Sequence, residues 1–252
     1  MTSPSLARRP SVDASAPSAI AQRVAAINWT QVGAQLDSYG CASTGSLLTD
    51  EECAALTDLY GSDAVFRSRI VMSRHGFGRG EYKYFAYPLP DTIRALREEL
   101  YSPLADIANR WNEELGSAAL YPRDHAAYLL RCHQAGQTKP TPLLLQYGTG
   151  DYNCLHQDLY GEHIFPLQVA FLLSRPHVDF TGGEFVLAEQ RPRMQSRAEV
   201  VPLGQGEGVI FPVRYRPVQG TRGPYRVTMR HGVSRVRSGH RHTVGIIFHD
   251  AK

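Results

Sequence analysis

The segment LLLQYGTGDYNCLHQD (residues 143–158) decides the fold that we predict for this chain. Its first five residues form an apolar run of strand length, and glycine and polar residues follow, as they do between strands. In an extended strand, His156 and Asp158 project from the same face while Gln157 points away. The segment therefore predicts β-structure in which two metal-binding side chains converge.

The rest of the C-terminal half continues this β-rich pattern. After residue 142, short apolar runs alternate with Gly, Pro and polar residues, which is typical of an all-β barrel or double sheet. The strands expected besides LLLQY are LQVAFLL (167–173), GGEFVLAEQ (182–190), AEVVPL (198–203), GVIFP (208–212), YRVTMRHGV (225–233) and RHTVGIIFH (241–249). We expect these strands to form a jelly-roll core over residues 141–252.

The N-terminal half is predicted to be a helical layer. The spacing of its apolar residues favours helices over residues 20–36, 91–115 and 124–135. Thr49 and Glu52 form a capping-box pattern that opens a further short helix. Pro103 is expected to break the helix predicted over residues 91–115, because proline has no N–H to donate and its ring collides with the preceding turn.

These patterns predict one domain and a tail. Residues 1–18 are rich in Ser, Pro and Ala and contain almost no large apolar side chain, so burial cannot offset the entropy of ordering them. We expect a disordered tail there and a single domain over residues 19–252, in which a helical layer and lid (19–140) braces the jelly-roll core. The predicted fold class is α+β.

The composition excludes several other classes of protein. With 252 residues, of which 42% are hydrophobic, the chain can bury a substantial core. No apolar run approaches the roughly 18 residues of a membrane span, and the N-terminus lacks the apolar stretch of a secretory signal. The four cysteines are irregularly spaced without a CxxC pair, which argues against a disulfide framework or a zinc knuckle. We therefore expect a soluble cytoplasmic protein.

Arginine is concentrated in one stretch near the C-terminus, although the net charge of the whole chain is only +3. In that stretch only Glu199 and Glu207 oppose the positive charges. The arginines are Arg191, Arg193, Arg197, Arg214, Arg216, Arg222, Arg226, Arg230, Arg235, Arg237 and Arg241. This imbalance favours the binding of an anion.

A third metal ligand must come from elsewhere in the chain. His231 is the best candidate, because its β-like segment can pair alongside the strand of His156. Two histidines and one carboxylate on a triangular face leave three coordination positions open, as in non-haem Fe(II) oxygenases, whereas a structural zinc site has none. Cys154 is expected to be a buried thiol that does not bind the metal.

Other histidines compete with His231 for this role. His163 lies beyond a turn and His177 in a loop, whereas the remaining alternatives, His240, His242 and His249, belong to the last expected strand. Arg241 favours His231, because it follows ten residues later on what we expect to be the adjacent strand. There its guanidinium could bind a carboxylate through paired hydrogen bonds.

The chain resembles the Fe(II)/2-oxoglutarate-dependent dioxygenases over residues 143–249. The matching motifs are HQD (156–158), RHGV (230–233) and SGHRHTVGIIF (238–248). The resemblance implies a double-stranded β-helix, a cupin-like barrel in which His156, Asp158 and His231 bind Fe(II). It also implies that Arg241 binds the far carboxylate of 2-oxoglutarate.

The same resemblance implies the reaction. With O2, 2-oxoglutarate is converted to succinate and CO2, and a substrate C–H bond becomes C–OH. If that carbon is attached to nitrogen, the product loses its alkyl group. Tyr147 precedes His156 by nine residues, where related enzymes often place a tyrosine that contacts the cosubstrate. A strand tyrosine is as often part of the core, so both roles stay open for Tyr147.

The segment FRSRIVMSRHGFGRGEYKYFAYPLP (66–90) is predicted to form two strands or extended arms around a glycine-rich tip. With ANRWNEEL (108–115), it resembles prokaryotic 2-oxoglutarate oxygenases linked to oxidative repair of alkylated nucleic acid. Its cationic and aromatic side chains suit a lid that contacts phosphates and stacks on a flipped or single-stranded base. The candidate substrate-binding residues are Arg74, Arg79, Tyr82 and Tyr84. Alternatively, the aromatic residues pack the helical layer onto the barrel.

Two other functions stay open. The Arg-x-Asn-x-x-x-x-Arg motif of well-known alkylation-damage demethylases is absent, and the spacing of His231 and Arg241 resembles that of prolyl-hydroxylase-type enzymes. The second function is therefore hydroxylation of a protein side chain, an amino acid or another small molecule. A third is that of a cupin-like sensor that binds metal without consuming 2-oxoglutarate, because fold does not fix function.

Overall fold

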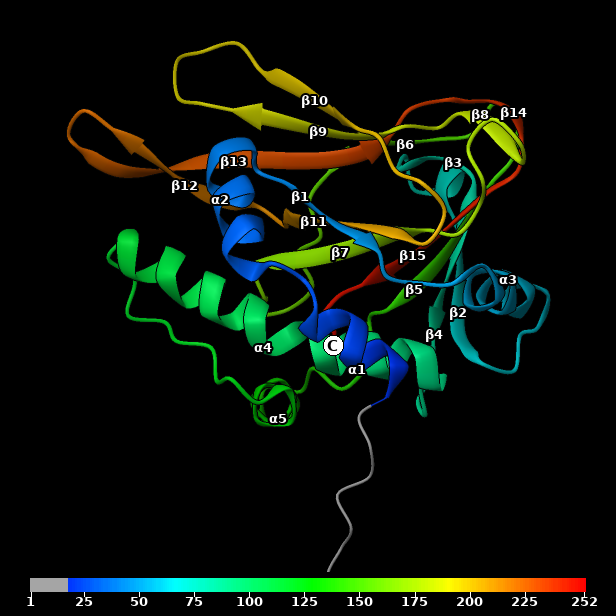
Figure 1. The fold of residues 1–252 in the computed structure, drawn as a ribbon, viewed down its shortest axis with the longest axis horizontal. Helices are drawn as coiled ribbons and strands as arrows, with labels where there is room; N and C mark the ends of the chain where they lie inside the picture. The colour runs from blue at the N-terminus through cyan, green and yellow to red at the C-terminus, as the bar shows by residue number, and fades with distance from the viewer. Residues whose placement is uncertain (1–17) are drawn as a thin grey trace, which may run out of the picture.

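Two antiparallel β-sheets lie face to face in residues 18–252, the part of the chain described by the structure, which is a computed structural model (Figure 1). In spatial order, the larger sheet consists of β1 (Ala42–Ser46), β11 (Glu207–Pro212), β7 (Leu167–Leu172), β15 (Arg241–Ile246), β5 (Leu143–Tyr147), β4 (Glu81–Phe85) and β2 (Phe66–Val71). The smaller sheet consists of β10 (Arg197–Val201), β9 (Phe185–Gln190), β13 (Gly223–Val233), β6 (Tyr152–His156) and β3 (Gly78–Arg79), and β12 (Tyr215–Gly220) pairs with β13. A separate ribbon pairs β8 (Phe180–Gly182) with β14 (Val236–Gly239).

Helices cover the outer face of the larger sheet (Figure 1). They are α1 (Ala19–Ala25), α2 (Trp29–Tyr39), α3 (Asp50–Asp58), α4 (Asp91–Glu114) and α5 (His125–Gln134), with single 3-10 turns at Leu59–Gly61 and Met72–Arg74. Leu96, Leu100 and Leu104 recur at helical spacing on α4 and share one apolar core with Val169 and Phe171 of β7. The opposite face of the larger sheet is therefore the one that meets the smaller sheet.

The strand sequences reflect these positions. β7 lies inside the larger sheet and is buried at nearly every residue, so its sequence LQVAFL is apolar apart from Gln168. β9 is buried only at alternate residues, as expected for a strand with one face against the core and one toward solvent. A buried polar residue in the middle of β7 therefore needs a specific partner.

The predicted helix over residues 20–36 is wrong in its extent. The pattern belongs to two helices, α1 and α2, because Asn28 caps a new helix by accepting a hydrogen bond from the backbone N–H of Gln31. The capping box of Thr49 and Glu52 is confirmed, and it opens α3. The helix predicted over residues 124–135 is confirmed as α5.

The predicted break at Pro103 is also wrong, because α4 continues through it. Leu100 and Leu104 stand on either side of the proline, and both are fully buried. Their packing outweighs the single backbone hydrogen bond that a proline inside a helix removes. Tertiary contacts therefore decided the length of this helix.

The predicted fold class, an α+β arrangement with a jelly-roll-like double sheet, is confirmed. Each strand expected after residue 142 is present within a few residues of its predicted bounds. Segment 66–90 forms β2 and β4 around a tip that contains β3, as expected. β4 of the N-terminal half pairs with β5 of the C-terminal half, so the two halves share one sheet. On this ground we propose that residues 19–252 are a single domain.

The tail predicted over residues 1–18 lies outside the described residues except for Ser18. The hydroxyl of Ser18 accepts a hydrogen bond from the backbone N–H of Ala21 and so caps α1. Within residues 18–252, none of the helices combines the length and the apolar character that crossing a membrane requires.

Candidate active site

A cavity of about 250 Å³ lies between the two sheets. Strands β5, β7 and β15 line it from the larger sheet, and β6 and β13 line it from the smaller sheet. Its polar lining includes Tyr147, Asn153, His156, Asp158, Gln168, His231, Arg241 and Thr243. The cavity therefore contains every residue for which the sequence predicted a role in binding metal or cosubstrate.

Strand pairing brings the three predicted metal ligands together. β13 pairs with β6 so that His231 lies directly opposite His156. Nε2 of His156 lies 3.5 Å from Oδ1 of Asp158, and Nε2 of His231 lies 3.3 Å from Oδ2 of Asp158. The candidate ligand atoms all lie within 4.8 Å of one another, and residues 18–252 contain no second group of three such side chains. Asp158 lies in the loop after β6, which ends at His156, and not in the strand as predicted.

Neighbouring groups hold these ligands in orientations that suit a metal ion. Nδ1 of His156 lies 2.8 Å from the carbonyl oxygen of Cys154, so Nδ1 carries the proton and Nε2 is left as the ligand atom. Asp158 accepts hydrogen bonds from the hydroxyl of Tyr160 at 2.8 Å and from the amide of Gln168 at 2.9 Å. The polar residue inside the apolar run of β7 thus has its partner in the site.

The protonation states of Asp158 and His231 suit metal binding. Burial lowers the pKa of the third member, His156, but the Asp158 carboxylate raises it by more. Burial by itself raises the pKa of Asp158, but the adjacent rings of His156 and His231 lower it by more, so its pKa lies well below its ordinary value. Burial lowers the pKa of His231, and the neighbouring His156 ring lowers it further. A carboxylate and a neutral imidazole are the forms that bind metal ions.

Arg241 and Tyr147 belong to the opposite wall of the cavity. Both side chains are fully buried, and Nη1 of Arg241 donates a hydrogen bond to the hydroxyl of Thr243. The Nε of Arg241 and the hydroxyl of Tyr147 have no hydrogen-bond partner among the residues that the structure describes. Burial lowers the pKa of Arg241 to about 10, so its guanidinium is still charged at neutral pH.

These unpaired groups fit a ligand that carries a carboxylate. A buried guanidinium needs an anionic acceptor to offset its lost hydration, and a tyrosine hydroxyl can donate to the same anion. Oε1 of Gln168 is also buried without a partner within the described chain, so the cavity offers an acceptor as well. The residues present therefore suit a metal ion on one wall and an acidic cosubstrate that extends to the other.

The prediction that Arg241 follows His231 on the adjacent strand is wrong. Arg241 is on β15 of the larger sheet, whose neighbours are β5 and β7, while His231 is on β13 of the smaller sheet. The chain between them forms β14, which pairs with β8 outside both sheets. Arg241 consequently approaches the cavity from the sheet opposite the two histidines.

The other candidate ligands lie elsewhere. His240 and His242 line a separate surface pocket with Asp179, and Nδ1 of His249 accepts a hydrogen bond from the backbone N–H of Phe165. His163 and His177 are likewise outside the cluster of ligand atoms. Cys154 is exposed and not buried as expected, and its carbonyl oxygen rather than its thiol contacts His156.

Of the four candidate substrate-binding residues, only Tyr82 lines the cavity. Tyr84 is buried, and the guanidinium carbon of Arg67 lies 4.5 Å from the centroid of its ring. Tyr84 thus matches the packing alternative. Arg74 and Arg79 are exposed and do not line the cavity, although they belong to the segment that borders it.

Tyr160 and Gln168 were not predicted as site residues, and Phe77 was predicted only as one of the aromatic side chains of segment 66–90 that can stack on a base. Phe77 lines the cavity while remaining 47% exposed, and its ring stacks on His75 with centroids 5.3 Å apart. Gln168 could have been found, because a polar residue inside an apolar strand is a signal of a buried polar contact. Tyr160 carries no such signal, since a tyrosine in a loop is common.

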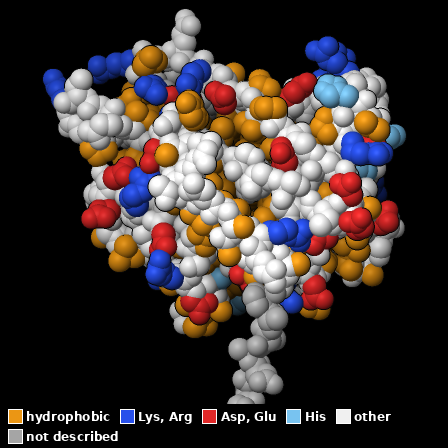
Figure 2. All heavy atoms as spheres, in the orientation of Figure 1, with side chains coloured by type: hydrophobic (Ala, Val, Ile, Leu, Met, Phe, Trp, Pro, Cys, Tyr) orange, Lys and Arg blue, Asp and Glu red, His pale blue; other side chains and the backbone are white. Residues whose placement is uncertain are grey.

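Part of the arginine excess is structural. Glu189, just before the arginine-rich stretch, forms ion pairs with Arg191 at 2.7 Å and with the buried Arg216. In the space-filling view, basic side chains gather along the upper left edge, over the ends of the β9–β10 and β12–β13 hairpins (Figure 2). Exposed arginines of these hairpins are Arg193, Arg197, Arg222 and Arg226. Anion binding by these residues stays a prediction.

A double-sheet barrel whose cavity joins a His-Asp-His cluster to a buried arginine defines the class of Fe(II)/2-oxoglutarate-dependent oxygenases. Residues 80–251 match the family model Oxygenase-NA, which is described as an oxygenase catalysing oxidative methylation of damaged DNA. The chain belongs to this family. Two uncharacterized proteins from different strains of Mycobacterium tuberculosis are each 52% identical over 195 residues, which cover 75% of this chain and 84% of the relative.

Solved structures share the fold at low sequence identity. An oxidoreductase of the 2OG-Fe(II) oxygenase family from Burkholderia pseudomallei superimposes with a TM-score of 0.54 at 16% identity, covering 88% of this chain and 92% of that chain. A Trichoplax adhaerens prolyl hydroxylase, in complex with a hypoxia inducible factor peptide fragment, gives 0.51 at 16% identity and covers 89% of each chain. A Pseudomonas putida prolyl-4-hydroxylase gives 0.50 at 13% identity, covering 89% of this chain and 99% of that chain.

The double-stranded β-helix implied by the sequence resemblance is thereby confirmed. The chain is an oxidoreductase, and its cofactors are Fe(II), 2-oxoglutarate and O2. A metal-binding sensor without enzymatic activity does not agree with this assignment.

Proposed function

We propose that this oxygenase oxidises alkyl groups in damaged nucleic acid. In this proposal, His156, Asp158 and His231 hold Fe(II), while Arg241 and Tyr147 hold the far carboxylate of 2-oxoglutarate. The observation that carries the assignment of these residues is a fully buried guanidinium with an unpaired Nε in the same cavity as three convergent metal ligands. When bound, Fe(II) supplies the oxidation of a C–H bond with O2 and 2-oxoglutarate.

The chain itself contributes binding and orientation. Arg241 neutralises a carboxylate that would otherwise lose hydration without compensation, and the hydroxyl of Tyr147 donates to the same group. The carboxylate of Asp158 is kept in place by Tyr160 and Gln168. Apolar side chains from both sheets, Leu145, Ala170, Phe185 and Phe211, line the rest of the cavity and exclude water.

The nucleic-acid substrate is supported by the family description and by the edge of the cavity. Phe77 presents an exposed aromatic face there, and His75 stacks behind it. Aromatic faces of this kind stack on flipped or single-stranded bases without regard to sequence. Arg74 and Arg79 flank Phe77 in the chain and are exposed, so they can contact phosphates. The arrangement suits a single-stranded substrate with one base directed into the cavity.

Hydroxylation of a protein side chain, an amino acid or another small molecule is the alternative. Its support is the ten-residue spacing between His231 and Arg241, which resembles that of prolyl-hydroxylase-type enzymes. A small-molecule substrate would need no stacking surface outside the cavity. The two substrate classes therefore differ in their dependence on Phe77.

One experiment separates these substrates. The protein is loaded anaerobically with Fe(II) and 2-oxoglutarate and then exposed to O2 with methylated oligonucleotides, peptides or amino acids, while succinate and the mass of each substrate are measured. We expect succinate and formaldehyde in equal amounts with methylated single-stranded DNA, and weaker binding at higher salt. Coupled hydroxylation of a peptide or amino acid, with no change in any oligonucleotide, would overturn the nucleic-acid proposal.

A further inference from the structure

The loop that carries Asp158 has no regular secondary structure, and one buried side chain satisfies much of its backbone. Residues 157–166 join β6 to β7 without helix or strand hydrogen bonds. Gln137, which follows α5, is fully buried. Its Oε1 accepts hydrogen bonds from the backbone N–H groups of Glu162 at 2.9 Å and His163 at 2.7 Å.

The amide nitrogen of Gln137 completes this contact. Nε2 donates to the carbonyl oxygens of His163 at 3.0 Å, Tyr160 at 3.3 Å and Asp250 at 2.6 Å. The two N–H groups of the amide are thus shared among three carbonyl oxygens, and both acceptor positions of Oε1 are also filled, so this side chain has no hydrogen-bonding capacity left. Because buried backbone groups must be paired, removing the amide leaves the loop with several unsatisfied groups.

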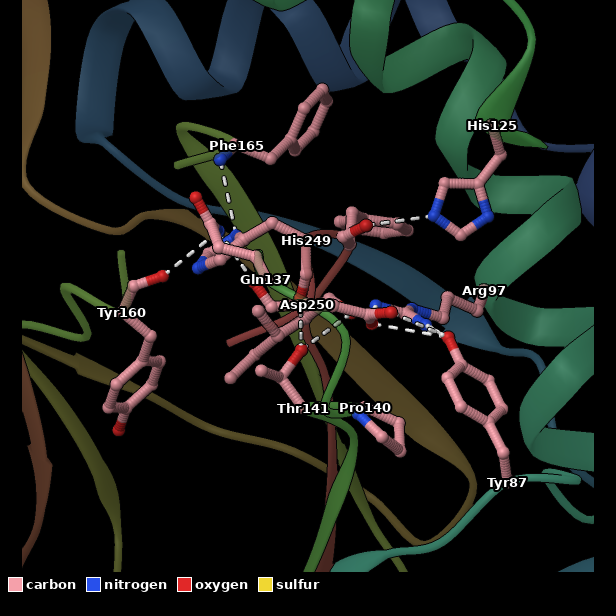
Figure 3. Close-up of polar contacts among 12 residues, drawn as sticks. Tyr87, Arg97, His125, Gln137, Pro140, Thr141, Tyr160, Phe165, His249 and Asp250 are labelled. Atoms are coloured by element: carbon pink, nitrogen blue, oxygen red, sulfur yellow. Dashed lines mark hydrogen bonds and ion pairs between the residues drawn. The ribbon is translucent and has the colours of Figure 1, made fainter. Parts of the chain in front are cut away.

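Gln137 is itself fixed to the helical layer through Asp250, which lies between Gln137 and Arg97 in Figure 3. The carboxylate of Asp250 is buried and accepts hydrogen bonds from Nη2 of Arg97 at 2.7 Å and from the hydroxyl of Tyr87 at 2.9 Å. Nε2 of His133, on α5, lies 2.8 Å from the same carboxylate. Gln137 therefore connects the loop to α4 and α5 as a rigid support.

The same loop contacts the candidate metal site through Tyr160. Tyr160, whose carbonyl oxygen binds Gln137, donates its hydroxyl to Oδ1 of Asp158 at 2.8 Å. Gly161 lies between Tyr160 and the two residues whose N–H groups bind Gln137. Its φ is +99°, and a Cβ at this position would lie 2.5 Å from Cδ of Gln137. The loop can thus close on the amide only with glycine there.

We propose that Gln137 is a positioning residue that holds the carboxylate of Asp158 in place for metal binding, acting through residues 160–163. The inference rests on the proposed function, because it takes Asp158 as a metal ligand. Groups outside the ligand set that orient metal ligands typically change metal affinity by about 10–100-fold when they are removed. A residue that does not line the cavity would thereby set the affinity of the site for iron.

The test measures metal binding and does not depend on turnover. Electron paramagnetic resonance of free Mn(II) gives the dissociation constant of the whole chain, with Mn(II) as a stand-in for Fe(II). We expect Gln137→Leu to weaken Mn(II) binding by about 10–100-fold. The matched control is Gln190→Leu, because Gln190 makes the same kind of side-chain contact with the backbone of Arg191 in the β9–β10 turn, away from the cavity. This control should bind Mn(II) as the wild type does.

Two further variants keep the test decisive if Gln137→Leu does not fold. Gly161→Ala displaces the loop from an intact Gln137 and should weaken Mn(II) binding as well. Gln137→Glu keeps both acceptor contacts but places a carboxylate against three carbonyl oxygens, so its affinity relative to wild type should recover as the pH is lowered and the carboxyl can donate again. A loss of general stability does not predict this relative recovery of metal affinity.

The outcomes separate the two proposals. If the wild type does not bind Mn(II), or binds it equally after His231→Gln, the proposed metal site fails. If wild-type binding depends on His231 but folded Gln137→Leu and Gly161→Ala bind Mn(II) within twofold of wild type, only the role of Gln137 is overturned.

Discussion

Arg241 and Tyr147 lie directly opposite each other on β15 and β5, and the guanidinium carbon of Arg241 is 5.6 Å from the centroid of the Tyr147 ring. Both side chains are buried and both keep an unpaired polar atom within the described residues. An arrangement of this kind weakens the folded protein unless a ligand completes it. The buried pair is therefore better explained as part of a binding site for a carboxylate than as a contact that stabilises the fold.

Replacing Arg241 should separate stability from function. We expect Arg241→Met to raise the free energy of unfolding of the ligand-free protein by about 1 kcal/mol or more, since a poorly paired buried charge becomes an apolar side chain. The same change should raise the KM for 2-oxoglutarate by about 30-fold or more, because loss of one partner of a buried charged pair costs about 2–5 kcal/mol. Thermal unfolding with and without 2-oxoglutarate, and succinate formation, measure both effects. The exposed Arg237→Met is the control, and a normal KM in Arg241→Met contradicts the assignment.

Metal loading should stabilise the protein through the predicted ligands. Mn(II) at 100 times its dissociation constant adds about 2.7 kcal/mol to the free energy of unfolding, which raises the Tm of a chain of this size by roughly 5–10 °C. Addition of a chelator should reverse the shift. His231→Gln should abolish it, whereas His240→Gln, at one of the alternative histidines, should retain it. If His240→Gln abolished the shift and His231→Gln retained it, the metal would bind near the start of β15 instead.

Substrate binding should depend on the exposed ring of Phe77. Stacking of a base on an aromatic side chain is worth about 1–3 kcal/mol, so Phe77→Ala should raise the KM for a methylated single-stranded oligonucleotide by roughly 5–150-fold with little change in kcat. Phe77→Trp should restore binding. Tyr39→Ala removes a similarly exposed ring from α2 and should have no effect. An unchanged KM in Phe77→Ala would favour a substrate that lies wholly inside the cavity.

Two buried histidines should make the fold sensitive to acid. Burial, with the nearby charge of Arg97, lowers the pKa of His125 and of His249 to about 4, whereas an unfolded histidine titrates near about 6.5. Between these values the unfolded chain takes up protons that the folded chain does not, so stability falls as the pH drops from about 6.5 to about 4. By pH about 4, each histidine lowers the free energy of unfolding by roughly 3 kcal/mol.

His125→Gln tests this dependence. The ring of His125 lies 2.8 Å from the carbonyl oxygen of Phe248, and a glutamine amide can donate to the same oxygen without titrating. Urea unfolding at several pH values between 7 and 4.5 should show about half the wild-type loss of stability. The exposed His75→Gln is the control, and its stability should follow that of wild type. Equal pH slopes in all three proteins would show that His125 is protonated in the folded state.

The convergence of His156, Asp158 and His231 was predictable because histidine and aspartate are residue types that commonly bind metal ions. Histidine and aspartate two positions apart bring two donors together in any extended segment, and a later β-like segment with a histidine can supply the third by pairing. The structure places His231 opposite His156 as expected. The continuation of α4 through Pro103 was not predictable in the same way, because local propensity was outweighed by packing against the sheet.

The supports of the site could not be predicted from local patterns. Gln137 and Asp250 are 113 positions apart, and their contact exists only because α5 and the end of the chain meet beneath the loop. Gln137 is a polar residue in a polar linker, so its sequence context does not distinguish it from a solvent-exposed side chain.

The reaction class follows from the residues themselves, since the sequence contains the donor atoms and the strand pattern that bring them near one another. Contacts between distant segments were needed to show from which side Arg241 faces the His-Asp-His cluster, which aromatic ring borders the cavity and which buried amide contacts the loop of Asp158. The physical reason is that coordination chemistry resides in individual side chains, whereas orientation and burial depend on contacts between segments distant in the chain.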